Sequence, residues 1–150
     1  MTAFAIAVAA LAVFAVGCEQ RQQSQAIDTE ETQMTDQGTQ AAQGEIVKAT
    51  TATFDAEVLQ ASLPVLVDFT ADWCAPCRAL HPTLVKLAAD YAGRVKVVSV
   101  DVDAAGALAS QYGVRGIPTL SVFKGGKVVD QTVGLQPESQ LRAMLDRHTD

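Results

Sequence analysis

The chain has 150 residues, a length that fits one domain with some additional sequence. Its formal net charge of −6 is unevenly spread: residues 18–46 hold six acids and one base, whereas residues 47–150 hold eleven acids and ten bases. Such a near-neutral domain lacks the clustered Lys and Arg of a nucleic-acid-binding surface, so we exclude nucleic acid as a partner. The three cysteines form one close pair and one outlier, which is not a structural disulfide framework.

Residues 1–17 predict an export signal. Residues 3–16 are fourteen consecutive apolar residues, whereas a membrane-spanning helix needs about 20, so the run has the length of a signal-peptide core. The small residues before Cys18 resemble the lipobox of bacterial lipoproteins, although Ala15 stands where Leu is usual and no Lys or Arg precedes the run. The resemblance implies that Cys18 is lipidated and begins the mature chain, anchored to a membrane on the periplasmic side of the cell envelope. An uncleaved short anchor and an ordinary signal peptide with an incidental cysteine are the alternatives.

The following segment, residues 18–45, predicts a disordered tether. From residue 19 to residue 45 it holds eight Gln, several Thr and acids, and no Phe, Trp or Tyr. Such a composition cannot bury enough apolar surface to offset the chain entropy lost on folding. At about 5–6 Å times the square root of its length, the tether has a mean reach of roughly 30 Å.

Residues 46–150 predict an α/β domain, because strand-like and helix-like patterns alternate along them. The run over 65–70 is apolar almost throughout, which is typical of a central strand covered on both faces. In chain order we expect a strand over 46–49, a helix over 54–61 capped by Thr53, and then the strand over 65–70. A helix over 74–91 follows, kinked at Pro82, and after it a strand over 95–100 and a helix over 104–112 that ends at Gly113. The domain closes with a hairpin of 119–123 and 128–133 around Gly125-Gly126, and with an amphipathic helix over 137–147 whose Leu141, Met144 and Leu145 face inward.

The motif Trp73-Cys74-Ala75-Pro76-Cys77 follows the central strand and opens the next helix. The unpaired N–H groups and the dipole of a helix N-terminus favour a thiolate at the first cysteine. Pro76 fits the first turn, where its missing N–H costs nothing. Cys77 lies on the same helix face as Cys74 and can attack a mixed disulfide formed by it. The spacing therefore predicts dithiol–disulfide exchange, with Cys74 as the more exposed nucleophile and Cys77 as the buried, resolving cysteine.

The alternative for the cysteine pair is half of a zinc site. A zinc site needs two further ligands, and the candidate histidines are His81, just past the pair, and His148, near the chain end. We therefore expect no metal.

Asp68 places a carboxylate in the middle of the apolar central strand. Burying it in the ionised form is costly, so we expect its pKa to be raised and the residue to be kept for a reason. A carboxyl that is merely hydrogen-bonded within the strand is the alternative.

From about residue 46 onward the chain resembles a thioredoxin. The matching residues stand in the family's order and spacing: Val67-Asp68-Phe69, the motif of residues 73–77, Pro82, Tyr112-Gly113-Val114-Arg115-Gly116-Ile117-Pro118-Thr119, and Phe123-Lys124-Gly125-Gly126-Lys127. Three positions depart from the family's pattern: Ala75 replaces a Gly, Thr70 an aromatic residue, and Ser99 a Lys that commonly sits near the buried Asp.

The resemblance implies a thioredoxin-like fold, with a mixed central sheet and helices on both faces. It implies that Asp68 lies beneath the cysteines and relays a proton to or from Cys77. It also implies that the peptide bond between Ile117 and Pro118 is cis and faces the cysteines, so that the Ile117 backbone pairs with the substrate backbone. An ordinary turn proline is the alternative for Pro118.

Three more residues belong to the substrate-binding region by the same resemblance. Trp73 would pack beside the active loop and shield the thiols, Pro76 lies between the cysteines, and Gly134 would let a substrate approach closely. A plain core tryptophan and a turn glycine are the alternatives for Trp73 and Gly134.

The predicted function is the reduction of protein disulfides by an exported, membrane-tethered thioredoxin. Pro76 precedes the second cysteine, as in reducing thioredoxins, whereas oxidants of the exported pathway usually carry His there. The redox group would be the Cys74–Cys77 pair without any cofactor. We expect a monomer that takes electrons from a membrane-bound or soluble thiol donor and passes them to disulfide-containing clients. The alternatives are an oxidase or isomerase, a dedicated reductase for cytochrome or copper-site apoproteins, and a module that binds clients without turnover.

Overall fold

The computed structural model of the chain describes residues 44–149. The predicted signal peptide over 1–17, the predicted lipidation site Cys18 and the predicted tether up to residue 43 lie outside the described residues. Within residues 44–149, no helix has both the length and the hydrophobicity that crossing a bilayer requires.

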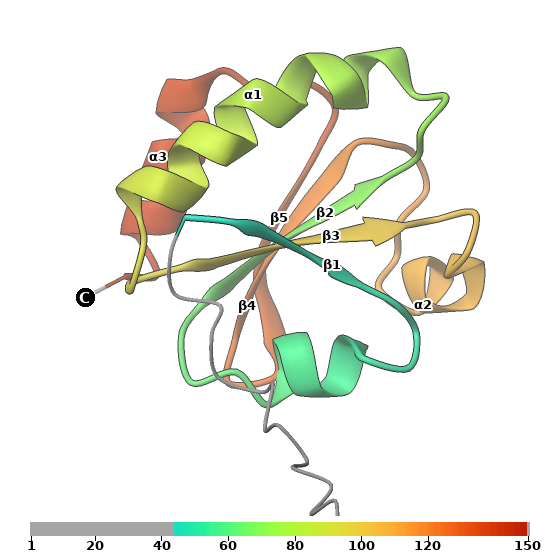
Figure 1. Cartoon of the computed structure of the whole chain (residues 1–150), viewed down its shortest axis with the longest axis horizontal. Helices are drawn as coiled ribbons and strands as arrows, with labels where there is room; N and C mark the ends of the chain where they lie inside the picture. Colours follow the sequence, from blue (N-terminus) through green and yellow to red (C-terminus); the bar gives the residue numbers. More distant parts are fainter. Residues whose placement is uncertain (1–43, 150) are drawn as a thin grey trace, which may run out of the picture. The chain divides into compact units, whose positions relative to one another are not determined.

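A mixed sheet with the strand order β1-β3-β2-β4-β5 forms the centre of the described domain (Figure 1). β1, β3 and β2 run parallel, β4 is antiparallel to β2, and β5 is antiparallel to β4. β2 is therefore the central strand, and every residue of it except Thr70 is buried, as its apolar run predicted. The strands are β1 (Ile46–Ala49), β2 (Val65–Thr70), β3 (Lys96–Asp101), β4 (Thr119–Lys124) and β5 (Lys127–Val133).

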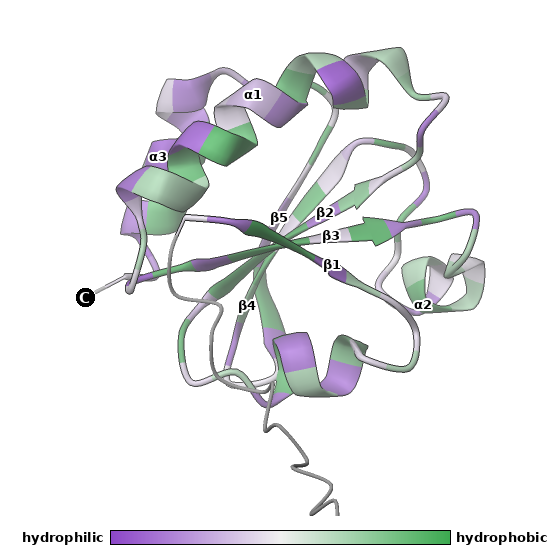
Figure 2. Ribbon diagram, viewed as in Figure 1, coloured by the Kyte–Doolittle hydropathy of each residue, from purple (hydrophilic) through white to green (hydrophobic). Residues whose placement is uncertain are grey.

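Helices cover both faces of this sheet (Figure 1). α1 (Ala75–Asp90) and α3 (Glu138–Asp146) lie on one face, and η1 (Asp55–Leu59) and α2 (Gly106–Gln111) lie on the other. Successive β2 side chains divide between the two resulting cores: Leu66 packs beneath α1 and α3, whereas Val67 packs with η1 and α2. Figure 2 shows apolar residues concentrated along the strands. The predicted fold class is confirmed.

The first helix differs from its prediction. The Thr53 hydroxyl accepts the Thr50 N–H at 3.0 Å instead of capping a helix. η1 begins at Asp55, whose carbonyl accepts the N–H of Gln60, five residues on, at 2.9 Å. A threonine hydroxyl can accept a hydrogen bond from a nearby backbone N–H instead of from the N–H groups of a following helix. Here the Thr53 hydroxyl accepts from the Thr50 N–H, which precedes the helix. The predicted cap at Thr53 is therefore wrong, and the helix is shorter than expected.

The remaining elements follow their predictions closely. Gly125 and Gly126 have φ of +58° and +75°, the left-handed conformations that suit a two-residue turn between twisted strands. α1 continues through Pro82, and the β3 and α2 boundaries shift by one or two residues. The three residues predicted to face inward from α3 are buried: Leu141, Met144 and Leu145.

Candidate active site

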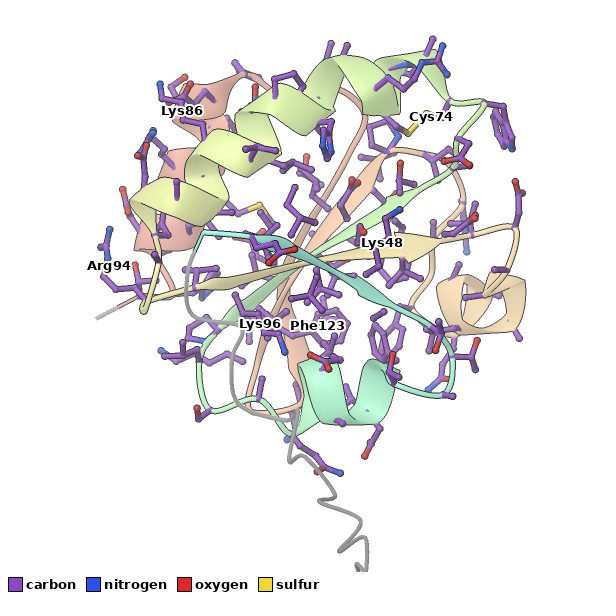
Figure 3. The ribbon with its side chains drawn as sticks, viewed as in Figure 1. Lys48, Cys74, Lys86, Arg94, Lys96 and Phe123 are labelled. Atoms are coloured by element: carbon purple, nitrogen blue, oxygen red, sulfur yellow. A yellow bond between two sulfur atoms is a disulfide. The ribbon has the colours of Figure 1, made fainter. Side chains whose placement is uncertain are left out.

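The cysteine pair lies where the loop after β2 turns into α1 (Figure 3). Cys74 is the N-cap of α1, with φ −77° and ψ 104°, and its Sγ accepts the Cys77 N–H at 3.2 Å. Pro76 lies in the first turn, so the donor that points at the sulfur is the N–H of the next residue. The two cysteines form a disulfide, with their Cα atoms 5.3 Å apart. The spacing thus brings the two sulfurs together at the helix N-terminus.

Both cysteines are buried in this oxidised state, each with 3% of its surface exposed. The prediction that Cys74 is the more exposed of the two is therefore wrong for the disulfide form. The bond to Cys77 holds the Cys74 sulfur over the first turn of α1, and Ala71, Val102 and Ile117 pack around the pair. The sulfurs are therefore bordered by an apolar rim.

Asp68 lies on the α1 face of β2, the same face as Leu66. It is 4% exposed, and its buried Oδ1 has no hydrogen-bond partner among the described residues. Desolvation by burial raises the pKa of Asp68 from 3.8 to about 7. The direction agrees with the expectation from the sequence. A carboxyl that titrates near neutrality can both accept and return a proton at physiological pH.

The loop before β4 presents backbone groups beside the cysteines. The Ile117–Pro118 peptide bond is cis, as the resemblance implied, and Ile117 packs against the cysteine pair. The Gly134 N–H donates to the Pro118 carbonyl at 2.7 Å, and φ of Gly134 is +87°. This glycine therefore holds the loop in place through a left-handed conformation. In the part of the chain that the structure describes, the Ile117 N–H and carbonyl make no hydrogen bond, so both can pair with another chain.

Trp73 borders the pair and is 67% exposed. Its indole Nε1 donates to Asp103 Oδ2 at 2.8 Å, which fixes the ring over the loop that follows β3. Asp103 was not among the residues predicted from the sequence. The signal that marks it is its place just past the carboxyl end of β3, a strand parallel to β2, at the edge of the sheet where the cysteine loop also begins. A surface groove of about 270 Å³ runs beside the indole, lined by Trp73, Val102, Gly106, Ala109, Ser110, Val114, Arg115, Gly116 and Ile117.

The histidines do not join the cysteines in a metal site. His148 lies past the end of α3 with its Nε2 3.3 Å from Asp130 Oδ2, and His81 is an exposed residue of α1. Within residues 44–149, no three His, Cys, Asp or Glu side chains are grouped to hold a metal ion. What the arrangement can do is exchange one disulfide for two thiols. It defines a thiol–disulfide oxidoreductase whose redox group is its own cysteine pair.

Known proteins agree with this class. The family model of thioredoxin matches residues 45–147, and the chain belongs to the thioredoxin family. Thioredoxin 1 of Nostoc sp. is 48% identical over 101 residues, which are 67% of this chain and 94% of that protein. Thioredoxin C-2 of Corynebacterium nephridii is 50% identical over 103 residues, 69% of this chain and 95% of that protein. A mutant thioredoxin from Halobacterium salinarum matches in structure with a TM-score of 0.67 and 39% identity, covering 73% of this chain and 96% of that chain.

The protein is accordingly a protein-disulfide oxidoreductase, and the substrates of its family are disulfide-containing proteins. The family needs no cofactor, because the redox-active disulfide is part of the polypeptide.

Proposed function

We propose that this protein reduces disulfides in client proteins, with Cys74 as the nucleophile, Cys77 as the resolving cysteine and Asp68 as the proton acceptor. The observation that carries the assignment is the position of Cys74 as the N-cap of α1, where its sulfur accepts the Cys77 N–H. When the pair is reduced, the same N–H and the helix dipole stabilise a thiolate at Cys74.

The reaction moves two electrons from the cysteine pair to the client. The Cys74 thiolate attacks one sulfur of the client disulfide, that bond breaks, and the released client thiolate takes a proton from solvent. The Cys77 thiol then gives its proton to the Asp68 carboxylate and attacks the Cys74 sulfur. The second client thiolate leaves and is protonated, and the Cys74–Cys77 disulfide of this structure forms. A thiol donor of the membrane or the surrounding medium must reduce that disulfide before the next cycle.

Client docking rests on the groups beside the cis peptide bond. The unpaired N–H and carbonyl of Ile117 can accept an extended client segment as an added strand. The groove beside Trp73 takes the apolar side chains of that segment. Extended segments are what a protein presents when its disulfide lies in a loop or a partly unfolded region.

The test of the mechanism uses the two cysteine variants. The purified protein should reduce insulin-type disulfides with a dithiol as donor, and Cys74→Ser should abolish turnover. Cys77→Ser should stop at a mixed disulfide with the client, which non-reducing gels and mass spectrometry detect. Full multiple turnover by Cys77→Ser would contradict a two-cysteine mechanism.

The direction of electron flow is tested by the reduction potential. Pro76 supplies no charge beside Cys74, unlike the histidine of oxidants, so we expect a potential of about −220 to −270 mV, in the range of glutaredoxin and thioredoxin. A redox titration against glutathione that returned about −120 mV would identify an oxidant instead.

We further infer that the domain is exported and held to a membrane by a lipid on Cys18. The support is the apolar run of residues 3–16 directly before Gly17-Cys18, and the polar composition of residues 19–45. The thioredoxin family model begins to match only at residue 45. Cys18→Ser should release the protein from membranes or leave it unprocessed, with disulfide reduction unchanged. Mass spectrometry of the native protein decides the matter, because a mature N-terminus other than a lipidated Cys18 excludes this anchor.

A further inference from the structure

A row of three side chains crosses the parallel half of the sheet on its α1 face. The strand register pairs Lys48 of β1 with Ser99 of β3, and Ser99 with Asp68 of β2. Residues paired across neighbouring strands project to the same face. The preceding row of that face packs in the core beneath α1 and α3, through Ile46, Val97 and Leu66. Lys48 therefore extends from β1 on the side of the sheet that α1 covers (Figure 3).

The two ionisable ends of this row both lack a partner. Asp68 is 4% exposed, and its Oδ1 has no hydrogen-bond partner in the described part of the chain. Lys48 is exposed and, within residues 44–149, its side chain makes no hydrogen bond or ion pair. Lys86 and Lys96, by contrast, are both ion-paired. A buried carboxylate without an opposite charge is costly, so its ionisation draws in a nearby cation that is free to move.

Lys48 can reach Asp68 across the strand between them. Two strand spacings of about 4.8 Å put the Cα atoms of Lys48 and Asp68 about 10 Å apart, and the flexible four-carbon stem of lysine covers much of that gap. Ser99, the residue between them, is small and half-buried. A cavity of about 250 Å³ opens beside it, lined among others by Lys48, Ser99 and Thr70. The cavity gives the lysine stem room to turn inward over Ser99.

The other ionisable groups on the elements next to this row do not supply a positive charge to Asp68. Asp72, in the loop after β2, and Asp101, next on the same face of β3, line the same cavity but are acidic. From α1, Cys77 is held in the disulfide, and His81 is an exposed residue one turn further along. β4 places the apolar Leu120 opposite Asp68.

We propose that Lys48 is a positioning residue of the exchange reaction: its ammonium turns in over Ser99 against the Asp68 carboxylate and holds that carboxylate ready for the Cys77 proton. The proposal rests on the proposed role of Asp68 as proton acceptor. While Asp68 is protonated it offers no opposite charge, and the lysine stays extended. Once Asp68 ionises, Lys48 is its counter-charge, and protonation by Cys77 releases the lysine again.

The direct test is a carbon-13 NMR titration of the Asp68 carboxyl in the full, oxidised chain, where neither active-site cysteine titrates. Lys48→Met should move the Asp68 midpoint up by about one pH unit, since an opposite charge a few ångströms away lowers a carboxyl pKa by about 1–3 units. Lys48→Arg, which keeps the charge, should restore most of the original midpoint. The matched control is Lys127→Met in β5, the opposite edge strand, which should leave the midpoint unchanged. A midpoint that does not move in Lys48→Met, or that moves equally in Lys127→Met, overturns the proposal.

The pH profile of client reduction separates this proposal from the role of Asp68. Asp68→Asn should remove the acid limb of the profile, and Lys48→Met should shift that limb upward by the same amount as the NMR midpoint. In the Asp68→Asn background, Lys48→Met should cause no further change. If Asp68→Asn leaves the acid limb in place, the proposed role of Asp68 is refuted, and so is the role of Lys48 that depends on it. If Asp68→Asn removes the limb but Lys48→Met does not shift it, only the role of Lys48 fails.

Discussion

Asp68→Asn should make the oxidised protein more stable, and the gain should grow with pH. Asparagine has nearly the same size and shape as aspartic acid but stays neutral at every pH. Asp68 is buried, and its pKa is raised from 3.8 to about 7 by loss of hydration. The variant therefore removes the ionisation of this carboxyl while keeping its volume in β2.

The expected magnitude follows from proton linkage. Between pH 4 and 7 the folded protein keeps a proton on Asp68 that the unfolded chain has released. The contribution of Asp68 to the free energy of unfolding is therefore fully present below its pKa in the unfolded chain and is lost as the pH rises through its pKa in the folded protein. A rise from 3.8 to about 7, at about 1.4 kcal/mol per pH unit, amounts to roughly 4 kcal/mol at high pH. From pH 5 to pH 8 the difference between the variant and the natural protein should grow by about 2.5 kcal/mol.

Urea unfolding of the oxidised proteins between pH 5 and 8.5 measures this difference, since the disulfide keeps both cysteines from titrating. The control is Asp72→Asn, which removes an exposed carboxyl from the loop beside the site and should leave the pH dependence parallel to that of the natural protein. Parallel curves for Asp68→Asn and the natural protein would refute the reasoning, because they would mean that Asp68 ionises in the folded and the unfolded chain alike.

Three further outcomes are expected. Asp68→Asn should slow client reduction about tenfold or more at pH 7 and less at pH 9, where hydroxide can deprotonate the resolving thiol; steady-state turnover across this range measures it. Asp103→Ala breaks the 2.8 Å hydrogen bond to the exposed Trp73. The free energy of unfolding in urea should change by less than about 0.5 kcal/mol, whereas the KM for a protein client should rise because the indole beside the cysteines is no longer held in place. Gly93→Ala should lower the free energy of unfolding by about 1–2 kcal/mol, because Gly93 has a left-handed backbone. Gly126→Ala should lower it further in the same urea assay, because Gly126 is also left-handed and its new Cβ would lie 3.1 Å from a carbonyl oxygen of η1.

The parts of the fold that the sequence predicted are those encoded locally. The apolar run over 65–70 marked the central strand because a strand covered on both faces needs no polar side. Gly125-Gly126 marked the hairpin because two successive left-handed residues strongly favour glycine. The Cys74 and Cys77 spacing indicated a disulfide at a helix N-terminus, since three residues in a first helical turn bring two side chains to one face.

The features that the sequence did not predict depend on contacts between elements or on a choice between equivalent local bonds. Thr53 could have capped its own helix, but its hydroxyl binds the Thr50 N–H instead. The hydrogen bond from Trp73 to Asp103 joins two loops thirty residues apart. The burial of Cys74 arises from the disulfide and its apolar neighbours in the oxidised state, which a pattern of residues along one helix does not contain.

The position of Asp68 is one where packing alone favours an apolar residue. It lies between buried neighbours, with Leu66 on the same face of β2 and Leu120 opposite in β4. A small domain has a total stability of about 5–15 kcal/mol, so a carboxyl that removes roughly 4 kcal/mol of it at high pH is a large burden. The same desolvation that destabilises the fold brings the pKa of this carboxyl to about 7, where it can change protonation during a reaction at neutral pH. On the proposed mechanism, a leucine here would stabilise the domain but leave the resolving thiol without its proton acceptor, so the proposed role of Asp68 accounts for a residue that the core does not need.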